Sequence, residues 1–333
     1  MSLPPVEIPL GAMRFNSDSQ KLEYFNGDVW MQVHTFSPNL DGGGRGLSIG
    51  GRTPTFQDVI DYVTIPTAGD AIDFGNLAAG NDWPAALASN TRGVVLGGRD
   101  PSNTNVIQYV TISTTGNTTD FGDIGGGQIR EAGAASNQTR GLNIGGKQAP
   151  GSYWNTIEYI TIASTGNSKD FGDINNVIGT MGSCASATRA VIAGGEFNSP
   201  HPTTDAIEFM TIATLGNAQD FGNLTDGSWA VSGCSNSIRG LFTGMDSPAR
   251  SQIDSIIIAS KGNATNFGDR TTTAYCLAAF TDPTRAVFAG GSSPTNIIGY
   301  NTIATEGDSV DFGDLTVARE RLTGCSNAHG GLG

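Results

Sequence analysis

The triplet Asp-Phe-Gly recurs along this chain at intervals of 45 to 50 residues, with Asn266 replacing the aspartate in one copy. Its six phenylalanines are Phe74, Phe121, Phe171, Phe221, Phe267 and Phe312. In protein kinases the triplet supplies a magnesium-binding aspartate, but it works there with a Gly-rich loop, a strand lysine and an H-R-D loop that this sequence lacks. A catalytic residue has no reason to recur at a fixed period, so the pattern indicates a structural repeat.

Each repeat contains four strand-sized segments in a fixed order. In one copy they are a small-residue stretch ("AGAASN", 132–137), an apolar segment ending in a glycine pair ("TRGLNIGG", 139–146), a segment dense in β-formers ("TIEYITI", 156–162) and the segment with the triplet. Apolar residues on both faces of the third segment predict a sheet that is covered on both sides. No segment combines helical periodicity with start and stop signals.

A four-stranded unit of this length is typical of one β-propeller blade. The small first segment is expected nearest the axis, the phenylalanine is interpreted as an anchor of the outer strand, and the aspartate and glycine as a turn. The first repeat lacks a small-residue segment before Arg45, and the missing segment occurs at 322–327. We therefore predict an all-β fold with a six-bladed propeller over residues 40–333, closed by its C-terminal strand. Seven blades are the alternative if residues 31–40 add a degenerate blade.

Charge and composition argue against several classes of partner. The formal net charge of −13 disfavours nucleic acid and anionic lipid surfaces. No apolar run reaches the roughly 18 residues needed to cross a bilayer, and the first residues lack the features of a signal peptide, so we expect synthesis in a cytoplasm without membrane insertion. The four cysteines show no C-x-x-C spacing, and Cys184, Cys234 and Cys325 recur at one repeat position, which favours small buried residues.

The repeat, with R-G/A, three apolar residues, G-G, then I-x-Y-h-T-I and G-N-x-x-D-F-G-D, resembles the Kelch-type propeller repeats of virion proteins of tailed bacteriophages. Met245, Ser255 and Asn301 depart from this pattern. Residues 11–33 are similar to a short β-module of phage tail-fibre polypeptides. The matching residues are Gly11, Arg14, Phe15, Asn16, Lys21, Leu22, Glu23, Gly27 and Trp30.

This resemblance implies a virion component that is made in the host cytoplasm, is not an enzyme and is present in several copies or as a homo-oligomer. Residues 1–39 would be an attachment module that contacts other virion proteins, with Arg14, Phe15, Tyr24 and Trp30 as its candidate residues. The propeller would recognise a host surface glycan or protein as a tail fibre or tail-associated adhesin. The alternative is a structural role in decorating the capsid or tail.

Variable loops provide the candidate binding residues. Loops between the second and third strands, and those before each first strand, should emerge on one face, whereas the turns on the other face are nearly uniform. Trp83, Trp154, Trp229 and Tyr275 lie in the variable loops, and exposed aromatic rings suit sugar or protein recognition. The other interpretation is that Trp83 and Trp229, near equivalent repeat positions, only fill the mouth of the channel.

Other motifs do not support chemistry. Residues 141–148 ("GLNIGGKQ") have the spacing of a phosphate-binding loop, but Gln148 replaces the Ser or Thr and no helix follows. The carboxylates of Asp120 and Asp123 could attract calcium, yet the dense D-x-D-x-D-G ligand loop is absent. His34, His201 and His329 occupy unrelated repeat positions, and the S-x-D-x-G-x-x-W box of sialidases is missing. We therefore expect no catalytic residues, no metal site and no cofactor.

Overall fold

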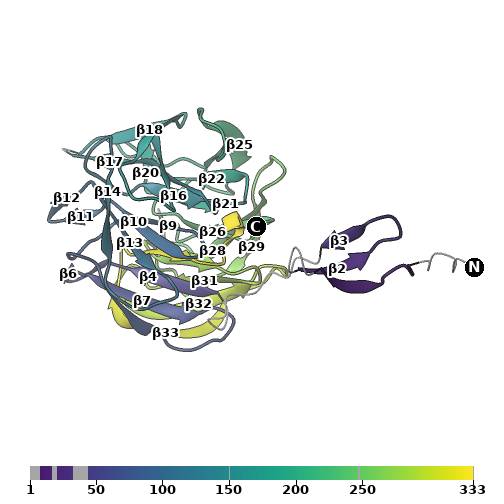
Figure 1. Ribbon diagram of the computed structural model, residues 1–333. Coiled ribbons are helices and arrows are strands. Elements are labelled where there is room, and N and C mark those ends of the chain that lie inside the picture. The colour runs from purple at the N-terminus through teal and green to yellow at the C-terminus, as the bar shows by residue number, and fades with distance from the viewer. Residues whose placement is uncertain (1–7, 17–20, 33–43, 150, 247, 333) are drawn as a thin grey trace, which may run out of the picture. The chain divides into compact units, whose positions relative to one another are not determined.

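The computed structural model describes residues 8–16, 21–32, 44–149, 151–246 and 248–332 (Figure 1). The chain divides into two compact units, Met1–Gly42 and Gly43–Gly333. The domain boundary predicted at residues 39 and 40, and most of the segment 31–40 considered for a seventh blade, lie outside the described residues.

The N-terminal unit is a three-stranded antiparallel sheet of β1 (Met13–Asn16), β2 (Lys21–Phe25) and β3 (Trp30–Gln32), in that order. The pairing places Met13 opposite Tyr24 and Tyr24 opposite Met31. Because side chains alternate across a strand, these three residues share one face of the sheet, and Arg14 and Glu23 share the other.

In the larger unit, the described residues form six antiparallel sheets of four or five strands. The first sheet contains β34 (Thr323–Ser326), β4 (Arg45–Ile49), β7 (Val59–Thr64) and β8 (Ile72–Asn76). The second contains β9 (Ala85–Ala88), β10 (Arg92–Leu96), β13 (Val106–Thr111) and β14 (Thr119–Asp123). The third contains β16 (Gly133–Ser136), β17 (Arg140–Gln148), β18 (Tyr153–Thr161) and β19 (Lys169–Asp173), with β15 (Ile129–Arg130) added beside β17.

The remaining sheets repeat the same order. The fourth contains β21 (Gly182–Ala185), β22 (Arg189–Ala193), β24 (Ala206–Thr211) and β25 (Gln219–Asn223). The fifth contains β26 (Ser232–Ser235), β27 (Arg239–Thr243), β28 (Gln252–Ile257) and β29 (Thr265–Asp269). The sixth contains β30 (Ala278–Thr281), β31 (Arg285–Ala289), β32 (Thr295–Thr302) and β33 (Val310–Arg319).

Short elements complete the larger unit. The variable loops form two-stranded sheets from β5 (Arg52–Thr53) and β6 (Thr55–Phe56), β11 (Arg99–Asp100) and β12 (Ser102–Asn103), and β20 (Ile178–Gly179) and β23 (Glu196–Phe197). Across the described residues the only helix is the 3-10 turn η1 (Gly330–Leu332). The prediction of an all-β fold is confirmed, and β34 pairs with β4 as expected for the strand missing before Arg45.

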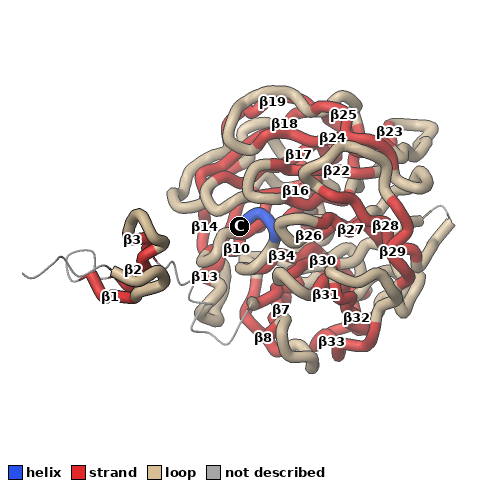
Figure 2. Tube along the Cα trace, turned by 90° about the vertical axis from the view of Figure 1, so that its right-hand side faces the viewer, coloured by secondary structure: helices blue, strands red, loops and turns tan. Residues whose placement is uncertain are grey.

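The six sheets follow one another in a cycle, although no single sheet closes on itself. The first strands contact each other in the order β9, β16, β21, β26, β30 and β34, and β34 contacts β9 again. Figure 2 shows several of them around η1. Six clusters of buried apolar side chains lie between consecutive sheets, and one of them joins the sixth sheet to the first through Phe280, Val287, Val63 and Ile65.

The Asp-Phe-Gly triplet lies within the fourth strand of each sheet, so the prediction of a turn there is wrong. In β8, Asp73 pairs with Asp61 and Gly75 with Ile60, which leaves Phe74 as the extra residue of a β-bulge. The phenylalanine is buried, with 2% of its surface exposed. Gly75 has φ of +147°, and an added Cβ would lie 2.4 Å from the carbonyl oxygen of Gly116 in the next sheet, so only glycine fits.

Five of the six buried phenylalanines belong to a stack of three side chains, which we call the Arg–aromatic–Phe stack. In the second sheet, the guanidinium of Arg92 lies 4.6 Å from the ring centre of Tyr109, and that ring meets Phe121 edge-on at 6.0 Å. Five sheets contain the stack, with Tyr62, Tyr109, Tyr159, Phe209 or Tyr300 in the middle. Cation–π and edge-to-face contacts are each worth about 0.5–1.5 kcal/mol.

The same arginines also join each sheet to the next. Their Nη1 atoms donate to carbonyl oxygens at 2.7–3.2 Å in the pairs Arg45–Ile112, Arg92–Ile162, Arg140–Ile212, Arg189–Ile258, Arg239–Ile303 and Arg285–Ile65. The last pair connects the sixth sheet to the first. The repeated T-R step of the sequence is therefore a contact between sheets.

We expect Arg285→Ala to lower the free energy of unfolding by about 2 kcal/mol, because it removes a charged hydrogen bond and a cation–π contact. Arg92→Ala should cost a similar amount, since the contact between the sixth and first sheets resembles the others. Urea unfolding followed by circular dichroism would measure both values.

Arg52→Ala is the matched control, because Arg52 also makes a hydrogen bond, to Pro54 O, and a cation–π contact, with Phe56 at 5.5 Å, but both partners lie in its own loop and neither contact joins two sheets. Its cost should stay below about 0.5 kcal/mol. A cost for Arg285→Ala as small as that of Arg52→Ala would contradict the joining role of the repeated arginine.

Candidate functional site

Six segments that precede the first strands surround one end of a central cavity. Each places a non-glycine residue at φ between +56° and +60°; these residues are Trp83, Glu131, Thr180, Ala230, Cys276 and Arg321. A positive φ is unusual for residues with a Cβ, and it is least favourable for β-branched Thr180. Six equivalent segments thus share one strained conformation, and five of these residues, all but Arg321, line the cavity.

Backbone hydrogen bonds connect five of the six junctions between these segments. Arg321 N donates to Cys276 O at 2.8 Å, Trp83 N to Arg321 O at 2.9 Å and Glu131 N to Trp83 O at 3.2 Å. Thr180 N donates to Glu131 O, and Val231 N to Thr180 O. Between Ala230 and Cys276, which are both described, there is no such bond; the adjacent rings of Trp229 and Tyr275 meet instead, with centres 5.6 Å apart. Main-chain contacts therefore fix most of the rim.

The cavity inside this rim has a volume of about 110 Å³. Its wall consists of the small side chains of the first strands, such as Ala134, Ser183 and Gly233, and its rim includes Trp83, Glu131 and Thr180. Small residues keep the inner space open where six strands converge, as the sequence predicts.

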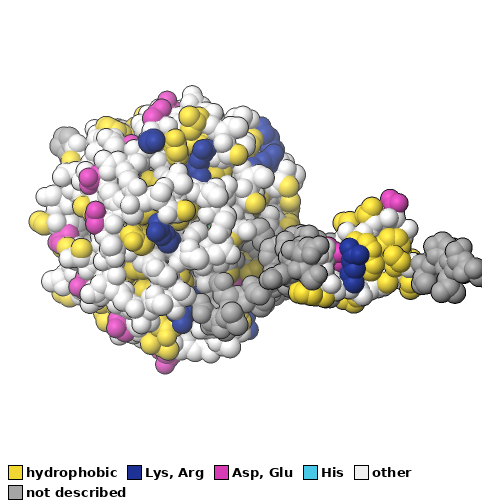
Figure 3. Space-filling model, in the orientation of Figure 1, with side chains coloured by type: hydrophobic (Ala, Val, Ile, Leu, Met, Phe, Trp, Pro, Cys, Tyr) yellow, Lys and Arg dark blue, Asp and Glu magenta, His cyan; other side chains and the backbone are white. Residues whose placement is uncertain are grey.

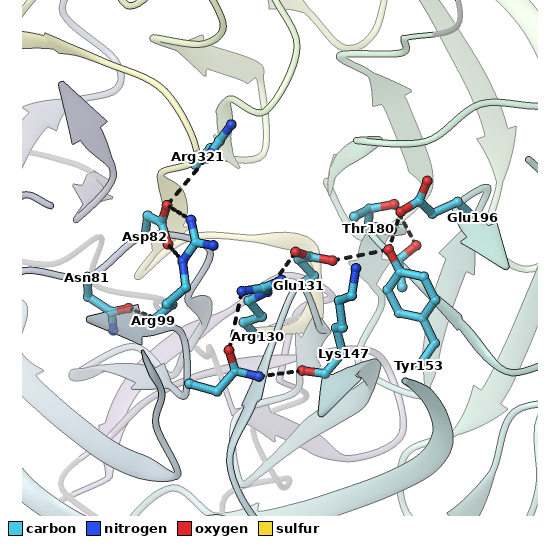
Figure 4. A network of polar contacts seen from close by, with 12 residues as sticks. Asn81, Asp82, Arg99, Arg130, Glu131, Lys147, Tyr153, Thr180, Glu196 and Arg321 are labelled. Carbon is cyan, nitrogen blue, oxygen red and sulfur yellow. Dashed lines mark hydrogen bonds and ion pairs between the residues drawn. The ribbon is translucent and has the colours of Figure 1, made fainter. Parts of the chain in front are cut away.

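Ion pairs fix the charged side chains beside the rim (Figure 4). Arg99 donates to both carboxylate oxygens of the fully buried Asp82, at 2.9 and 2.7 Å, and Arg321 Nη1 lies 3.6 Å from the same carboxylate. Arg130 Nε is 2.8 Å from Glu131 Oε1. A bidentate arginine holds a carboxylate in one orientation, so the polar groups here are preorganised.

Tyr153 connects two carboxylates from different loops. Its hydroxyl lies 3.2 Å from Glu131 Oε2 and also contacts Glu196 Oε1, while Lys147 Nζ lies 4.9 Å from its ring centre. Burial of the ring, followed by the charges of Glu131 and Glu196, raises the pKa of Tyr153. The phenol therefore stays protonated and is a hydrogen-bond donor at the edge of the site.

The structure separates the four predicted aromatic residues. Trp83 lies on the rim, with the guanidinium of Arg321 5.7 Å from its ring centre, and Trp229 contacts Tyr275. Trp154 lines a different cavity beside Gly126 and Glu158, which shares no lining residue with the central one. All four side chains are half-buried, so the expectation of exposed rings is wrong.

Trp83 and Trp229, which the sequence places near equivalent repeat positions, lie one residue apart in the repeat. Trp83 corresponds to Ala230 by its positive φ, whereas Trp229 corresponds to Asp82, because each pairs with the following variable loop through a β-bridge, at Asp246 and at Arg99. One aromatic side chain thus belongs to the rim position and the other to the position before it.

The C-terminal turn occupies the other end of the central space. A second cavity of about 60 Å³ lies between the first strands and His329. His329 Nε2 is 2.9 Å from Ala88 O, and Gly331 N donates to His329 Nδ1 at 3.1 Å, so the ring is neutral with its proton on Nε2. Burial lowers the pKa of His329 and outweighs the opposing effect of the bond to Ala88.

This arrangement predicts a pH-dependent contribution to stability. Because the pKa is lower in the folded chain, the unfolded chain binds the proton more tightly, and the folded state loses stability as the pH falls below about 6.5. At pH 8, His329→Gln should be less stable than the parent, and the difference should shrink at pH 5. Urea unfolding at both pH values would measure it.

The stability of the parent must be compared with that of His329→Gln at each pH, because other buried groups also titrate on folding. Burial raises the pKa values of Glu158 and Glu208. Their titration is common to the parent and the variant and cancels in the difference. A difference that is unchanged from pH 8 to pH 5 would show that His329 does not titrate with folding.

The other candidate groups of the sequence lie apart. His34 is outside the described residues, and His201 is exposed, with Nδ1 3.7 Å from Glu196 Oε1. The segment 141–148 belongs to strand β17 and is not a loop before a helix.

The four cysteines are buried and free, as expected. Among the described residues, no cluster of three or more His, Cys, Asp or Glu has the arrangement needed for a metal ion. That part of the chain also contains no helix with the length and apolar character that a membrane crossing requires.

The predicted attachment residues lie on two faces of the N-terminal sheet. Phe15 and Tyr24 are exposed, as are Met13 and Met31 on the same face. Arg14 and Trp30 face each other with the guanidinium 4.2 Å from the ring centre, and Arg14 also pairs with Glu23 at 2.8 Å. Hydrogen bonds from Asn16 and Arg14 lower the pKa of Glu23. Apolar side chains gather on this unit in Figure 3.

Sequence reasoning did not identify Glu131, Tyr153, Glu196 or Arg321. Glu131 and Arg321 occupy the residue before the predicted first strands, so alignment of the repeats at that residue would have indicated a common place on the rim. Tyr153 and Glu196 come from loops of different length, and their contact carries no signal in the sequence. No protein family model and no curated protein matches this chain.

Proposed function

We propose that residues 43–333 form a six-bladed β-propeller that presents a binding site at the rim of its central cavity. The cycle of contacts between first strands and the six apolar clusters between consecutive sheets support this architecture. The inter-sheet hydrogen bond of Arg285 to Ile65 supports the junction between the last blade and the first. In this proposal the four strands of each sheet are one blade, and β34 completes the first blade.

The observation that carries the binding function is the composition of the rim. It combines the indole of Trp83 with the carboxylate of Glu131, and Arg130 and the phenol of Tyr153 beside the rim hold that carboxylate in a fixed orientation. Sugars are bound by aromatic faces together with preorganised polar groups. The net charge of −13 favours a neutral or cationic glycan, or a protein, over an anionic polymer.

We infer that the protein is a bacteriophage virion component of the tail-fibre or tail-adhesin type, which recognises the host surface without catalysis. The repeat and the N-terminal sequence that resemble such proteins support this assignment. The exposed face with Met13, Phe15, Tyr24 and Met31 supports attachment, because a small sheet with an apolar face needs a partner to cover it. Other virion proteins would be that partner, and the particle would carry several copies.

A structural role as a capsid or tail decoration protein is the second candidate. The observation in its favour is that aromatic side chains at the rim already have partners, since Trp229 packs on Tyr275 and Trp83 on Arg321. In that case the rings would stabilise the loops and would not meet a receptor.

Binding of the isolated protein to host cells distinguishes the two candidates. Trp83→Ala should weaken binding about tenfold to thirtyfold, because loss of a stacked indole removes about 1–2 kcal/mol by buried area. Trp229→Ala should weaken it to a similar extent, since it also releases Tyr275. Flow cytometry with labelled protein would give the affinities.

Trp154→Ala is the matched control, because Trp154 lines a cavity separate from the rim. Its affinity should equal that of the parent, and all variants should keep the parental melting temperature. If the parent does not bind host cells, or if folded Trp83→Ala and Trp229→Ala bind as well as the parent, the decoration role replaces the adhesin role.

The N-terminal unit generates a separate prediction. Protein that consists of residues 37–333 should fold but should not be incorporated into virions, because it lacks the apolar face proposed for attachment. Immunogold labelling of particles assembled with this fragment would show whether it is present, and labelling of the full-length protein would show where on the particle it lies. A fragment incorporated as efficiently as the full chain would exclude the attachment role.

The double substitution Phe15→Ser, Tyr24→Ser should reduce incorporation of the full chain into virions. Leu215→Ser, an exposed substitution in the larger unit, should leave incorporation unchanged.

A further inference from the structure

The fifth sheet lacks the central ring of the Arg–aromatic–Phe stack. Ser255 occupies the position that a tyrosine holds in other sheets. It pairs with Leu241 of the second strand, just as Tyr109 pairs with Val94 in the second sheet and Tyr300 with Val287 in the sixth. The arginine and the phenylalanine of the stack are still present. The guanidinium of Arg239 lies 5.4 Å from the ring centre of Phe267, with no aromatic ring between them.

A cavity of about 190 Å³ lies beside Arg239 and Ser255, and Phe267 does not line it. Its lining includes Arg239, Ser255, Ile257, Lys261, Thr265 and Glu306. Cavities of about 150 Å³ inside proteins are large enough to hold benzene. This cavity, unlike those, is open to solvent, and its volume is sufficient for one aromatic ring.

The charged groups favour a ring with a hydroxyl group. The planar guanidinium of Arg239 can stack on an aromatic face, as the equivalent arginines do at 4.6–4.7 Å in five sheets. A phenol hydroxyl can donate to the carboxylate of Glu306 and accept from the ammonium of Lys261. Ser255 itself is buried and contacts Thr265, with 3.3 Å between their hydroxyl oxygens.

We propose that the cavity at Ser255 binds a phenol-type aromatic ring, which takes the position that tyrosine side chains hold in the other sheets. The site lies where the third strands end and the uniform turns begin, so it is distinct from the rim of the central cavity and does not depend on the function proposed there. The ring is that of a free phenol or of a tyrosine on a partner protein.

Titration of the intact protein with p-cresol, the side-chain analogue of tyrosine, tests the proposal. Isothermal titration calorimetry should show one molecule bound per chain, with a Kd on the order of 1 mM. Ser255→Tyr fills the cavity and should abolish saturable binding. If that variant does not fold, Arg239→Gln provides the second test and should weaken binding about tenfold, because it removes the stacking cation.

A gain-of-site variant is the matched control. Tyr109→Ser opens the equivalent space beside Arg92 in the second sheet, where Thr115 and Thr165 stand in place of Lys261 and Glu306, and the new site should bind p-cresol more weakly than the fifth sheet does. Binding of N-acetyl-L-tyrosinamide with the affinity of p-cresol would identify a tyrosine of a partner protein as the occupant, whereas binding of p-cresol alone would identify free phenols. Absence of binding to the parent, binding unaffected by Ser255→Tyr, or a second site in folded Tyr109→Ser that binds p-cresol as tightly as the first would each overturn the proposal.

Discussion

The arrangement of the six sheets depends on a guanidinium that makes two contacts at once. Each repeated arginine covers an aromatic ring of its own sheet and donates a hydrogen bond to a carbonyl oxygen of the next sheet, as Arg140 does to Tyr159 and Ile212. The ring in turn rests on a buried phenylalanine. One side chain thus links the packing within a sheet to the spacing between sheets, which explains why the arginine, the aromatic residue and the phenylalanine recur together in the sequence.

Structural features that recur in every repeat could be predicted from the sequence, whereas those that depend on contacts between neighbouring sheets could not. The strand order, the small first strands and the closing strand β34 follow from the period and from residue size. The bulge at Phe74 was missed because Gly75 is required by the approach of Gly116, which lies in another sheet. The one-residue offset between Trp83 and Trp229 can be counted from the repeated arginines, since Trp83 stands nine residues before Arg92 and Trp229 ten before Arg239.

The candidate site combines a rigid backbone with variable side chains. Positive φ values at the rim cost about 1 kcal/mol or more each for residues other than glycine, and the backbone hydrogen bonds between segments offset this strain. Because these bonds use only main-chain atoms, the side chains at the rim are free to differ, and they include an indole, a carboxylate and a guanidinium.

The junction between Ala230 and Cys276 differs from the other five in what holds it at the rim. Five junctions rely on main-chain hydrogen bonds, which almost any substitution leaves intact, whereas this one relies on the contact between Trp229 and Tyr275 and on the hydrogen bond from Ser232 Oγ to Leu277 O. Its strength is therefore set by the identity of side chains. Natural variation at Trp229 and Tyr275 can tune how firmly the rim closes at one defined place, and it can do so without changing any hydrogen bond of the backbone circle.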